Sequence, residues 1–270
     1  MKSLSIAIFI FIIISFVSCS QTDKPSIDLV ERDVTYTSDS TTLKGFLVYD
    51  ANIKEKRPGV LVVHEWWGLN DYARNRARML AELGYTAFAL DMFGDGQTAN
   101  HPQDAQKFAA FIFNNLNIGE ERFMAAYNYL KLQETVDSNN IAAIGYCFGG
   151  GIVLHMARIG TNLKAIASFH GGLSTQTPAQ KNVVKAFLLV CNGADDPFTT
   201  KQQIEKFKAE MDSANVQYEF INYEGAVHSF TNPAADSLGK KFELPLAYNE
   251  KADKESWQEM QKVFMQVFSK

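Results

Sequence analysis

The stretch I-A-A-I-G-Y-C-F-G-G-G, residues 141–151, joins a short apolar run to a cysteine that stands between glycines. The apolar run predicts a buried strand, and the pattern that resumes at Ile152 predicts a helix. Gly145 and Gly149 flank Cys147 at positions where a Cβ atom would crowd a sharp strand-to-helix turn. The pattern is that of the G-x-S-x-G nucleophile elbow with sulfur in place of oxygen, which indicates an α/β sheet with a reactive group at a strand end.

The position of Cys147 in this turn favours a reactive thiol. A helix N-terminus behind the cysteine stabilises its thiolate, and the N–H of Phe148 points to the place where an oxyanion would form. A packed structural cysteine is the alternative interpretation of the same pattern. A phosphate-binding loop fits less well, because G-Y-C-F-G-G-G matches neither G-x-G-x-x-G nor the lysine-containing P-loop.

Along the rest of the chain, apolar runs typical of strands alternate with helical patterns. Strands are expected over residues 34–36, 43–49, 58–64, 85–90, 141–145, 164–169, 186–191 and 218–223. Helices are expected over 71–83, over 102–132 with a break at Gly119, directly after Cys147, and over the C-terminal stretch that contains Trp257 and Phe268. The fold class is therefore α/β, a doubly wound and mostly parallel sheet with an N-terminal antiparallel hairpin.

The composition fits one well-filled globular domain. Hydrophobic residues make up 46% and charged residues 21% of the 270 residues, so a second domain is not needed to account for the length. The formal net charge is -4, and the Lys and Arg residues form no long run. Nucleic acid is therefore not expected as a partner.

The first residues have the pattern of an export signal. Lys2 precedes an apolar run from Leu4 to Val17, which is shorter than the run of about 20 residues that a membrane-spanning helix needs. Ser18 directly before Cys19 resembles a bacterial lipoprotein processing site. We predict a signal peptide over 1–18, a tether over 19–29 anchored to the membrane by lipid on Cys19, and an exported cell-envelope domain over 30–270. An ordinary secreted protein with an incidental Cys19 is the alternative.

A candidate acid and a candidate base follow two later strands, where ligands of a doubly wound sheet bind. Asp195 and Asp196 come after the predicted strand that ends at Cys191, and His228 comes after the next one. They follow Cys147 in the hydrolase order of nucleophile, acid and histidine. Each residue alone is compatible with a turn or surface position, but their joint order and placement favour a catalytic triad.

The other histidines fit the role of base less well. His170 also follows a strand and is the serious rival, but it precedes both candidate acids. His64 lies before the nucleophile, His101 lies in a polar loop, and His155 lies inside the helix after the elbow. No His or Cys cluster has metal-ligand spacing, so neither a metal nor another cofactor is expected.

Glu65 is a further candidate, because it directly follows the buried strand that ends at His64. At the mouth of an apolar pocket, beside Trp66 and Trp67, desolvation would disfavour its ionised form. A helix-capping or surface glutamate is the alternative interpretation.

The two cysteines of the domain are not expected to form a disulfide. Cys147 and Cys191 lie two strands apart in the predicted sheet, a separation of about 9 to 10 Å. A disulfide rarely spans more than about 7 Å between Cα atoms.

Five motifs together resemble the dienelactone hydrolase family of α/β hydrolases. They are H-E-W-W-G-L-N from His64, D-M-F-G from Asp91, G-Y-C-F-G-G from Gly145, G-A-D from Gly193 and E-G-A-V-H-S-F from Glu224. The resemblance covers roughly residues 30–270. It implies an α/β-hydrolase fold and an enzyme that hydrolyses a small-molecule ester or lactone through an acyl-enzyme intermediate.

The resemblance also implies roles for single residues. Cys147 would be the nucleophile, His228 the general base and acid, and Asp195 the orienting acid, because Asp195 rather than Asp196 occupies the family's G-x-D position. Glu65 would contact the thiol at rest and help to take its proton once substrate arrives. The backbone N–H groups of Trp66 and Phe148 would form the oxyanion hole.

Departures from the family pattern bear on the substrate. Asn232 and Asp95 stand where family members that act on dienelactone have arginines for its carboxylate. We therefore expect a neutral or apolar substrate, in an aromatic pocket that includes Trp66 and, as further candidates, Trp67, Phe93, Tyr146 and Phe230. A non-catalytic envelope binding protein and a thiol-redox protein remain the alternative functions.

Overall fold

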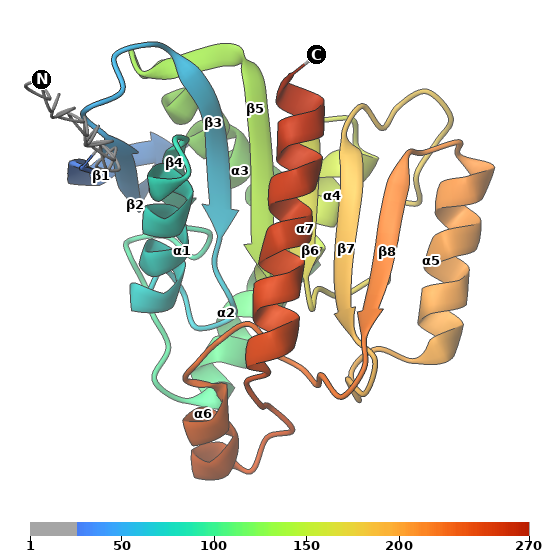
Figure 1. Cartoon of the computed structure of the whole chain (residues 1–270). Coiled ribbons are helices and arrows are strands. Elements are labelled where there is room, and N and C mark those ends of the chain that lie inside the picture. Colours follow the sequence, from blue (N-terminus) through green and yellow to red (C-terminus); the bar gives the residue numbers. More distant parts are fainter. Residues whose placement is uncertain (1–25, 270) are drawn as a thin grey trace, which may run out of the picture.

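The computed structural model describes residues 26–269 (Figure 1). The predicted signal peptide over 1–18, the lipidation site Cys19 and most of the predicted tether lie outside these residues. The fold begins with a strand at Leu29, close to the predicted start of the domain at residue 30. Within residues 26–269, no helix combines the length and the apolar character that crossing a bilayer requires.

The described chain forms one mixed sheet with the strand order β1-β2-β4-β3-β5-β6-β7-β8. β1 pairs antiparallel with β2 and β2 pairs antiparallel with β4, whereas all later neighbours are parallel. The predicted N-terminal hairpin and parallel sheet are therefore confirmed. The strands are β1 (Leu29–Ser38), β2 (Thr41–Asp50), β3 (Arg57–Val63), β4 (Thr86–Leu90), β5 (Val136–Tyr146), β6 (Ala165–Phe169), β7 (Phe187–Gly193) and β8 (Tyr218–Tyr223).

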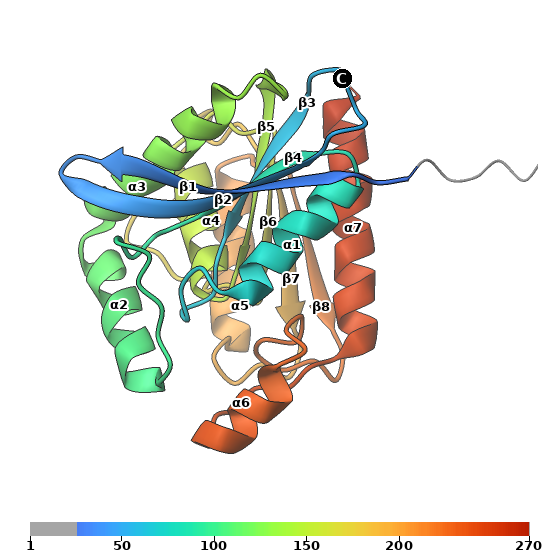
Figure 2. The ribbon, with the colours of Figure 1, turned by 90° about the vertical axis from the view of Figure 1, so that its left-hand side faces the viewer.

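Helices cover both faces of the sheet (Figures 1 and 2). α1 and α7 pack on one face, and α3, α4 and α5 pack on the other. α6 lies beyond the carboxyl ends of the strands (Figure 1). The helices are α1 (Asp71–Glu82), α2 (Pro102–Asn114), α3 (Leu116–Lys131), α4 (Phe148–Arg158), α5 (Lys201–Ser213), α6 (Ala235–Phe242) and α7 (Glu250–Phe268).

β3 shows why the central strands have continuous apolar sequences. Leu61 and Val63 join the core between the sheet and the layer of α3 and α4. Val60 and Val62 point the other way, into the core beneath α1 and α7. Because side chains alternate between two covered faces, every side chain of a central strand is buried, and apolar residues are favoured at each position.

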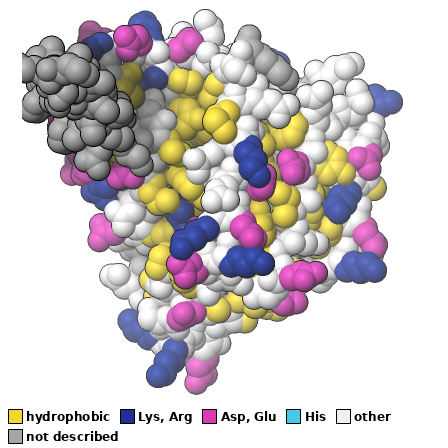
Figure 3. Space-filling view, in the orientation of Figure 1, with side chains coloured by type: hydrophobic (Ala, Val, Ile, Leu, Met, Phe, Trp, Pro, Cys, Tyr) yellow, Lys and Arg dark blue, Asp and Glu magenta, His cyan; other side chains and the backbone are white. Residues whose placement is uncertain are grey.

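The C-terminal helix α7 is amphipathic, as its sequence pattern predicts. Met260 and Phe264 are fully buried against the sheet. Its outer side carries solvent-exposed pairs such as Lys254–Glu250. Over the face formed by α1 and α7, basic and acidic side chains are interspersed (Figure 3).

The helix break predicted at Gly119 is wrong. The break falls at Asn115, between α2 and α3, and Gly119 lies inside α3. A Cβ atom at Gly119 would lie 2.9 Å from the Cγ2 atom of Ile112, so this glycine allows the two helices to pack closely. α5 and α6 were not expected from the sequence pattern.

The connection between β5 and α4 is a single residue, Cys147, with φ 51° and ψ -113°. Such a conformation costs a non-glycine residue about 1–3 kcal/mol and persists only when the surroundings hold it. The N–H of Cys147 donates to the carbonyl of Phe169 at 3.0 Å, and the N–H of Gly149 donates to the carbonyl of His64 at 3.1 Å. The turn is therefore bonded to both neighbouring strand ends.

The glycines of the turn are required by close backbone contacts. A Cβ atom on Gly145 would lie 2.1 Å from the carbonyl oxygen of Gly149, and one on Gly149 would lie 2.3 Å from that of Val63. These neighbours are backbone atoms, which cannot rotate away as a flexible side chain can.

We predict that Gly145→Ala lowers the free energy of unfolding by about 3 kcal/mol or more, because the methyl group overpacks a rigid site. Gly172→Ala is the matched control, since no atom lies within 4 Å of a Cβ atom there. Its effect is expected to stay within about 0.5 kcal/mol. Urea unfolding of both variants measures the difference, and equal midpoints would contradict the packing argument.

Candidate active site

Three side chains from three strand ends meet beyond the carboxyl edge of the sheet. The Sγ atom of Cys147, after β5, lies 3.1 Å from Nε2 of His228, after β8. The Nδ1 atom of His228 lies 2.8 Å from Oδ2 of Asp196, after β7. The distances are those of a hydrogen-bonded nucleophile, base and acid.

The acid beside His228 is Asp196 and not the predicted Asp195. Asp195 points to solvent, while only its N–H is engaged, with the carbonyl of Ala226 at 3.0 Å. Asp196 is buried, and its second oxygen, Oδ1, accepts from the N–H of Phe198 at 2.8 Å. Both carboxylate oxygens of Asp196 are thus used, which fixes the orientation of the group that faces His228.

His228 carries its proton at neutral pH in this arrangement. Burial disfavours the charged imidazolium, but the adjacent Cys147 sulfur and the Asp196 carboxylate outweigh burial and raise the pKa of His228 from 6.5 to about 10. The imidazolium thus lies at hydrogen-bond distance from the sulfur of Cys147.

Glu65 is buried next to this site but does not contact the thiol, contrary to expectation. Its Oε1 accepts from the hydroxyl of Ser229 at 3.0 Å, and its Oε2 accepts from the amide of Asn232 at 2.6 Å. Burial raises the pKa of Glu65, and the two hydrogen bonds oppose this rise. The surface and helix-capping interpretations are wrong as well, since Glu65 is almost fully enclosed.

The rival histidine, His170, has a different position from that of a base. Its Nδ1 accepts from the N–H of Cys147 at 3.1 Å, and its Nε2 lies 2.7 Å from Oγ1 of Thr231. The ring therefore binds the backbone of the turn at Cys147 and forms no hydrogen bond with the sulfur. Because Nδ1 accepts a hydrogen bond, the proton of the neutral ring resides on Nε2.

The remaining histidines serve the scaffold. His64 is buried, with its Nε2 accepting from the N–H of Met92 at 3.2 Å. His155 of α4 pairs with Glu120 of α3, with Nε2 and Oε1 2.7 Å apart. His101 caps the N-terminus of α2.

The residues of the two predicted oxyanion donors are close to Cys147, since Phe148 follows it directly and Trp66 lines the same cavity. Phe148 is the first residue of α4, and Trp66 lies in the turn after β3. Within residues 26–269, the N–H groups of Trp66 and Phe148 donate no hydrogen bond to the protein. Both donors therefore remain unpaired within the fold.

Cys147 and His228 open into a cavity of about 430 Å³. Its surface is mostly apolar, and the aromatic side chains of Trp66 and Phe198 contribute to it. The ring of Phe198 packs edge-on against His228, with centroids 5.0 Å apart. The lining residues are Trp66, Pro102, Gln103, Gln106, Cys147, Phe198, His228, Leu244 and Leu246.

Four of the predicted pocket aromatics belong to the hydrophobic core instead. Tyr146 and Phe230 are fully buried on the α7 side of the sheet, and Phe93 is buried on the opposite side. Trp67 stacks on Phe242 away from the reacting pair. Only Trp66 among the predicted aromatics lines the cavity of Cys147.

Six of the residues that line this cavity were not predicted from the sequence. Phe198 lies two residues after Asp196, and its 54% exposure is unusual for a large apolar side chain. Leu244 and Leu246 lie in an irregular segment after α6 that has no periodicity. The parallel bridge between His228 and Leu246 brings that segment to the site, and no sequence signal predicts such a pairing.

The two departures from the family pattern do not face the cavity. Asp95 is exposed in the turn after β4, and Asn232 is buried against Glu65. Asp95 therefore does not lie where it could repel a substrate carboxylate in this cavity. No Lys, Arg, Asp or Glu of the described chain lines the cavity.

Cys191, the other cysteine of the domain, is a free and fully buried thiol in β7. Burial raises the pKa of Cys191 far above its ordinary value. Cys147 is free as well. Across residues 26–269, no three His, Cys, Asp or Glu side chains are arranged as a metal site.

The strand order, the parallel sheet and the sharp turn at Cys147 define an α/β hydrolase. Residues 43–268 match the dienelactone hydrolase family, and the chain belongs to that family. It is thus a hydrolase of esters or lactones.

Individual relatives support this assignment. A dienelactone hydrolase-like promiscuous phosphotriesterase from metagenomic libraries is 35% identical, with a TM-score of 0.82 over 88% of this chain and 98% of its own. The structure of m3DLH is 37% identical, with a TM-score of 0.83 over the same shares. A candidate carboxymethylenebutenolidase of Saccharolobus solfataricus is 26% identical over 89% of this chain and all of its own.

The buried carboxyl group of Glu65 predicts a measurable pH dependence of stability. In the unfolded chain Glu65 ionises near its ordinary pKa of 4.5, whereas burial raises its pKa in the folded protein. Above 4.5 the folded state therefore binds more protons than the unfolded state, and the free energy of unfolding falls as pH rises to the raised pKa. Glu65→Gln removes this contribution.

Urea unfolding at a series of pH values from acid to neutral is the test. The loss of stability with rising pH is expected to be smaller in Glu65→Gln than in the unchanged protein. Glu224→Gln is the control, because Glu224 is exposed. If the free energy of unfolding of Glu65→Gln fell with pH as steeply as that of the unchanged protein, the buried carboxyl group would not titrate in this way.

Proposed function

We propose that the protein hydrolyses a neutral, largely apolar ester or lactone through an acyl-enzyme intermediate on Cys147. The observation that carries this proposal is the contact of 3.1 Å between the Cys147 sulfur and His228, at the mouth of an apolar cavity. The buried Asp196 carboxylate at 2.8 Å completes the arrangement.

In the acylation step the thiolate of Cys147 attacks the carbonyl carbon of the substrate. The N–H groups of Trp66 and Phe148 stabilise the negative charge that develops on the carbonyl oxygen, and one such donor typically contributes about 3 kcal/mol. The His228 imidazolium then gives its proton to the leaving alcohol oxygen as the carbon–oxygen bond breaks. In a lactone the leaving oxygen stays attached to the acyl group.

In the deacylation step the neutral His228 takes a proton from water, and the hydroxide attacks the thioester carbonyl. Collapse of the tetrahedral intermediate expels the Cys147 thiolate and releases the carboxylic acid, while His228 keeps the proton that it took from water, so the initial thiolate and imidazolium are restored. Asp196 accepts from Nδ1 throughout, which fixes the ring so that Nε2 faces the sulfur. Glu65, held by Ser229 and Asn232, needs no movement for the sulfur to reach His228.

The cavity supports a neutral substrate. Its lining offers the apolar surfaces of Trp66, Phe198, Leu244 and Leu246 and no lysine or arginine. A substrate carboxylate would lose its hydration there without gaining a lysine or arginine partner, which is unfavourable.

We also propose that the chain is exported and anchored through lipid on Cys19. The support is the sequence pattern in which Lys2 precedes the apolar run from Leu4 to Val17, which Ser18 and Cys19 follow. Mass spectrometry of the mature N-terminus decides this point, and an unprocessed Met1 would refute it.

The nucleophile and the acid are tested together by trapping the intermediate. We expect an activated aryl ester to acylate Cys147, as mass spectrometry of the peptide would show, and Cys147→Ala to abolish turnover. Asp196→Asn is expected to lower kcat on the order of 10²- to 10⁴-fold, because the histidine loses its orienting carboxylate. Asp195→Asn is the matched control from the adjacent position and should change kcat by no more than about twofold.

Two outcomes would contradict the proposal. Full activity of Cys147→Ala would favour a binding role for the thiol site or a different nucleophile. A larger loss of kcat in Asp195→Asn than in Asp196→Asn would show that Asp195, the acid that the family pattern indicates, orients His228.

The substrate class is tested by comparing kcat/KM for neutral aryl esters and for dienelactone, whose carboxylate is charged. We expect the neutral esters to be preferred by at least about tenfold, since an unpaired buried charge costs more than 1.4 kcal/mol. A neutral aryl phosphotriester belongs in the same panel, because a relative is a promiscuous phosphotriesterase. A preference for dienelactone would overturn the cavity argument.

A further inference from the structure

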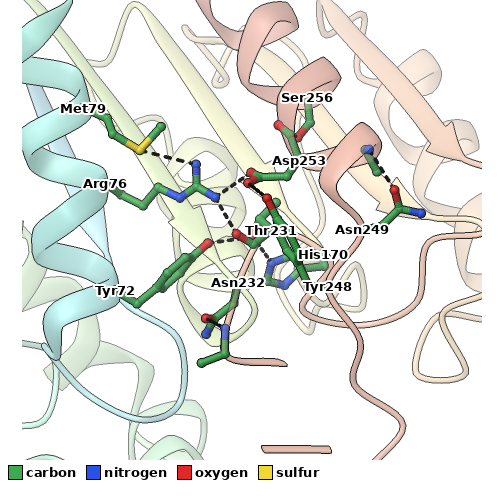
Figure 4. Close-up of polar contacts among 12 residues, drawn as sticks. Tyr72, Arg76, Met79, His170, Thr231, Asn232, Tyr248, Asn249, Asp253 and Ser256 are labelled. Carbon is green, nitrogen blue, oxygen red and sulfur yellow. Dashed lines mark hydrogen bonds and ion pairs between the residues drawn. The ribbon is translucent and has the colours of Figure 1, made fainter. Parts of the chain in front are cut away.

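Behind the reacting pair, buried hydrogen bonds connect the nucleophile to the segment that carries His228. Figure 4 shows the part of this network around His170 and Thr231. It begins at the N–H of Cys147, which donates to Nδ1 of His170 at 3.1 Å as well as to a backbone carbonyl. With Nδ1 as acceptor, Nε2 of the neutral ring carries the proton and donates to Oγ1 of Thr231 at 2.7 Å.

Thr231 is the centre of this network. Its hydroxyl also lies 2.7 Å from the hydroxyl of Tyr72, on α1. Its carbonyl oxygen accepts from Nη2 of Arg76 at 2.5 Å, and the same nitrogen pairs with Asp253 of α7 at 2.5 Å. Figure 4 shows Thr231 surrounded by these groups. Helix α1 therefore contacts Thr231 directly, and α7 contributes only through Asp253, which binds Arg76.

Because these hydrogen bonds are buried, the loss of any one of them is costly. His170 and Thr231 are 1% and 0% exposed, and Arg76 is 4% exposed. Water cannot replace a partner that is removed from such a site, so each lost bond leaves an unsatisfied polar group.

Thr231 lies three residues after His228, in the segment 228–232. The two neighbours Ser229 and Asn232 bind Glu65, so the segment has a second attachment through that carboxylate. Ser229 has a φ of 59°, a strained conformation that these attachments must hold. The side of the segment that faces away from substrate is thereby fixed to the scaffold.

We propose that His170 and Thr231 are positioning residues, which join the backbone of the nucleophile to the His228 segment and set the distance between the Cys147 sulfur and Nε2 of His228. The proposal rests on the proposed function, because that distance matters for acyl transfer. A misplacement of about 1 Å costs on the order of 10²-fold in rate, even when it arises away from the reacting atoms.

His170 suits this role because it stays neutral beside a cation. Its ring centroid lies 5.2 Å from that of His228. Burial, followed by the positive charges of His228 and Arg76, lowers the pKa of His170 well below 6.5. A protonated Nδ1 could not accept from the N–H of Cys147, so neutrality preserves the link.

Thr231→Val is the primary test, because valine has the shape of threonine without the hydroxyl. His170 Nε2–H and the Tyr72 hydroxyl lose their shared partner, so the segment is expected to shift relative to Cys147. We expect kcat for an aryl ester to fall about 10- to 100-fold. KM is expected to stay within about twofold, since Thr231 does not line the cavity. Thr231→Ser keeps the hydroxyl and should restore most of kcat.

Thr86→Val is the matched control for the loss of a buried hydroxyl. Thr86 is fully buried in β4, and its Oγ1 donates to Thr135 at 3.0 Å, at the opposite end of the sheet from the site. We expect a comparable loss of thermal stability in Thr86→Val without any fall in kcat. An equal fall of kcat in both variants would show that Thr231 acts through stability alone and would overturn the proposal.

A second measurement does not depend on turnover. The rate at which iodoacetamide alkylates Cys147 at pH 7, followed by mass spectrometry of its peptide, reports the thiolate that the His228 imidazolium favours. This rate is expected to fall severalfold in Thr231→Val and to recover in Thr231→Ser. Wild-type kcat together with a wild-type alkylation rate in Thr231→Val would refute the positioning role.

The two proposals fail in distinguishable ways. If the unchanged protein shows no esterase activity, the proposed function fails, while the alkylation rates still test the link between Thr231 and the sulfur–imidazole pair. If the unchanged protein is active and Thr231→Val is equally active, only the positioning role fails.

Discussion

The close approach of α4 to the ends of β3 and β5 is the constraint on which the rest of the site depends. Gly149 bonds the carbonyl of His64 at 3.1 Å, and a Cβ atom in its place would lie 2.3 Å from the carbonyl oxygen of Val63. Because the helix starts directly against these strands, the one residue between strand and helix must adopt a positive φ. That residue, Cys147, therefore stands at the carboxyl edge of the sheet with its sulfur exposed to the cavity.

Two buried carboxyl groups next to this turn have different electrostatic surroundings. Asp196 faces the His228 ring, and each of the two charged groups stabilises the other. Glu65 accepts from neutral donors, the hydroxyl of Ser229 and the amide of Asn232, and the positive charges of His228 and Arg76 offset only part of the cost of its burial. The first carboxyl group orients the base, and the second anchors the segment on which the base stands.

The reacting groups and the substrate cavity come from different parts of the fold. Cys147, Asp196 and His228 each follow a strand of the parallel sheet, so the scaffold positions them rigidly. The walls of the cavity come from the start of α2, the turn at Phe198 and the irregular segment near Leu246. Such segments can vary without disturbing the sheet, which is why one fold accommodates different esters. The apolar character of these walls sets the proposed preference for a neutral substrate.

By itself, the sequence determined the parallel sheet with its hairpin, the turn at Cys147 and the identity of His228 as the imidazole beside the sulfur. These features follow from local rules, because apolar periodicity reports burial and paired glycines report a close turn. Only the tertiary structure decided between Asp195 and Asp196, since the two lie past the end of β7, where side-chain direction no longer follows the period of a strand. It also placed Tyr146, Phe93 and Phe230 in the core and turned Glu65 away from the thiol. An aromatic ring fits a core and a pocket equally well by composition, and only the packing of distant segments distinguishes them.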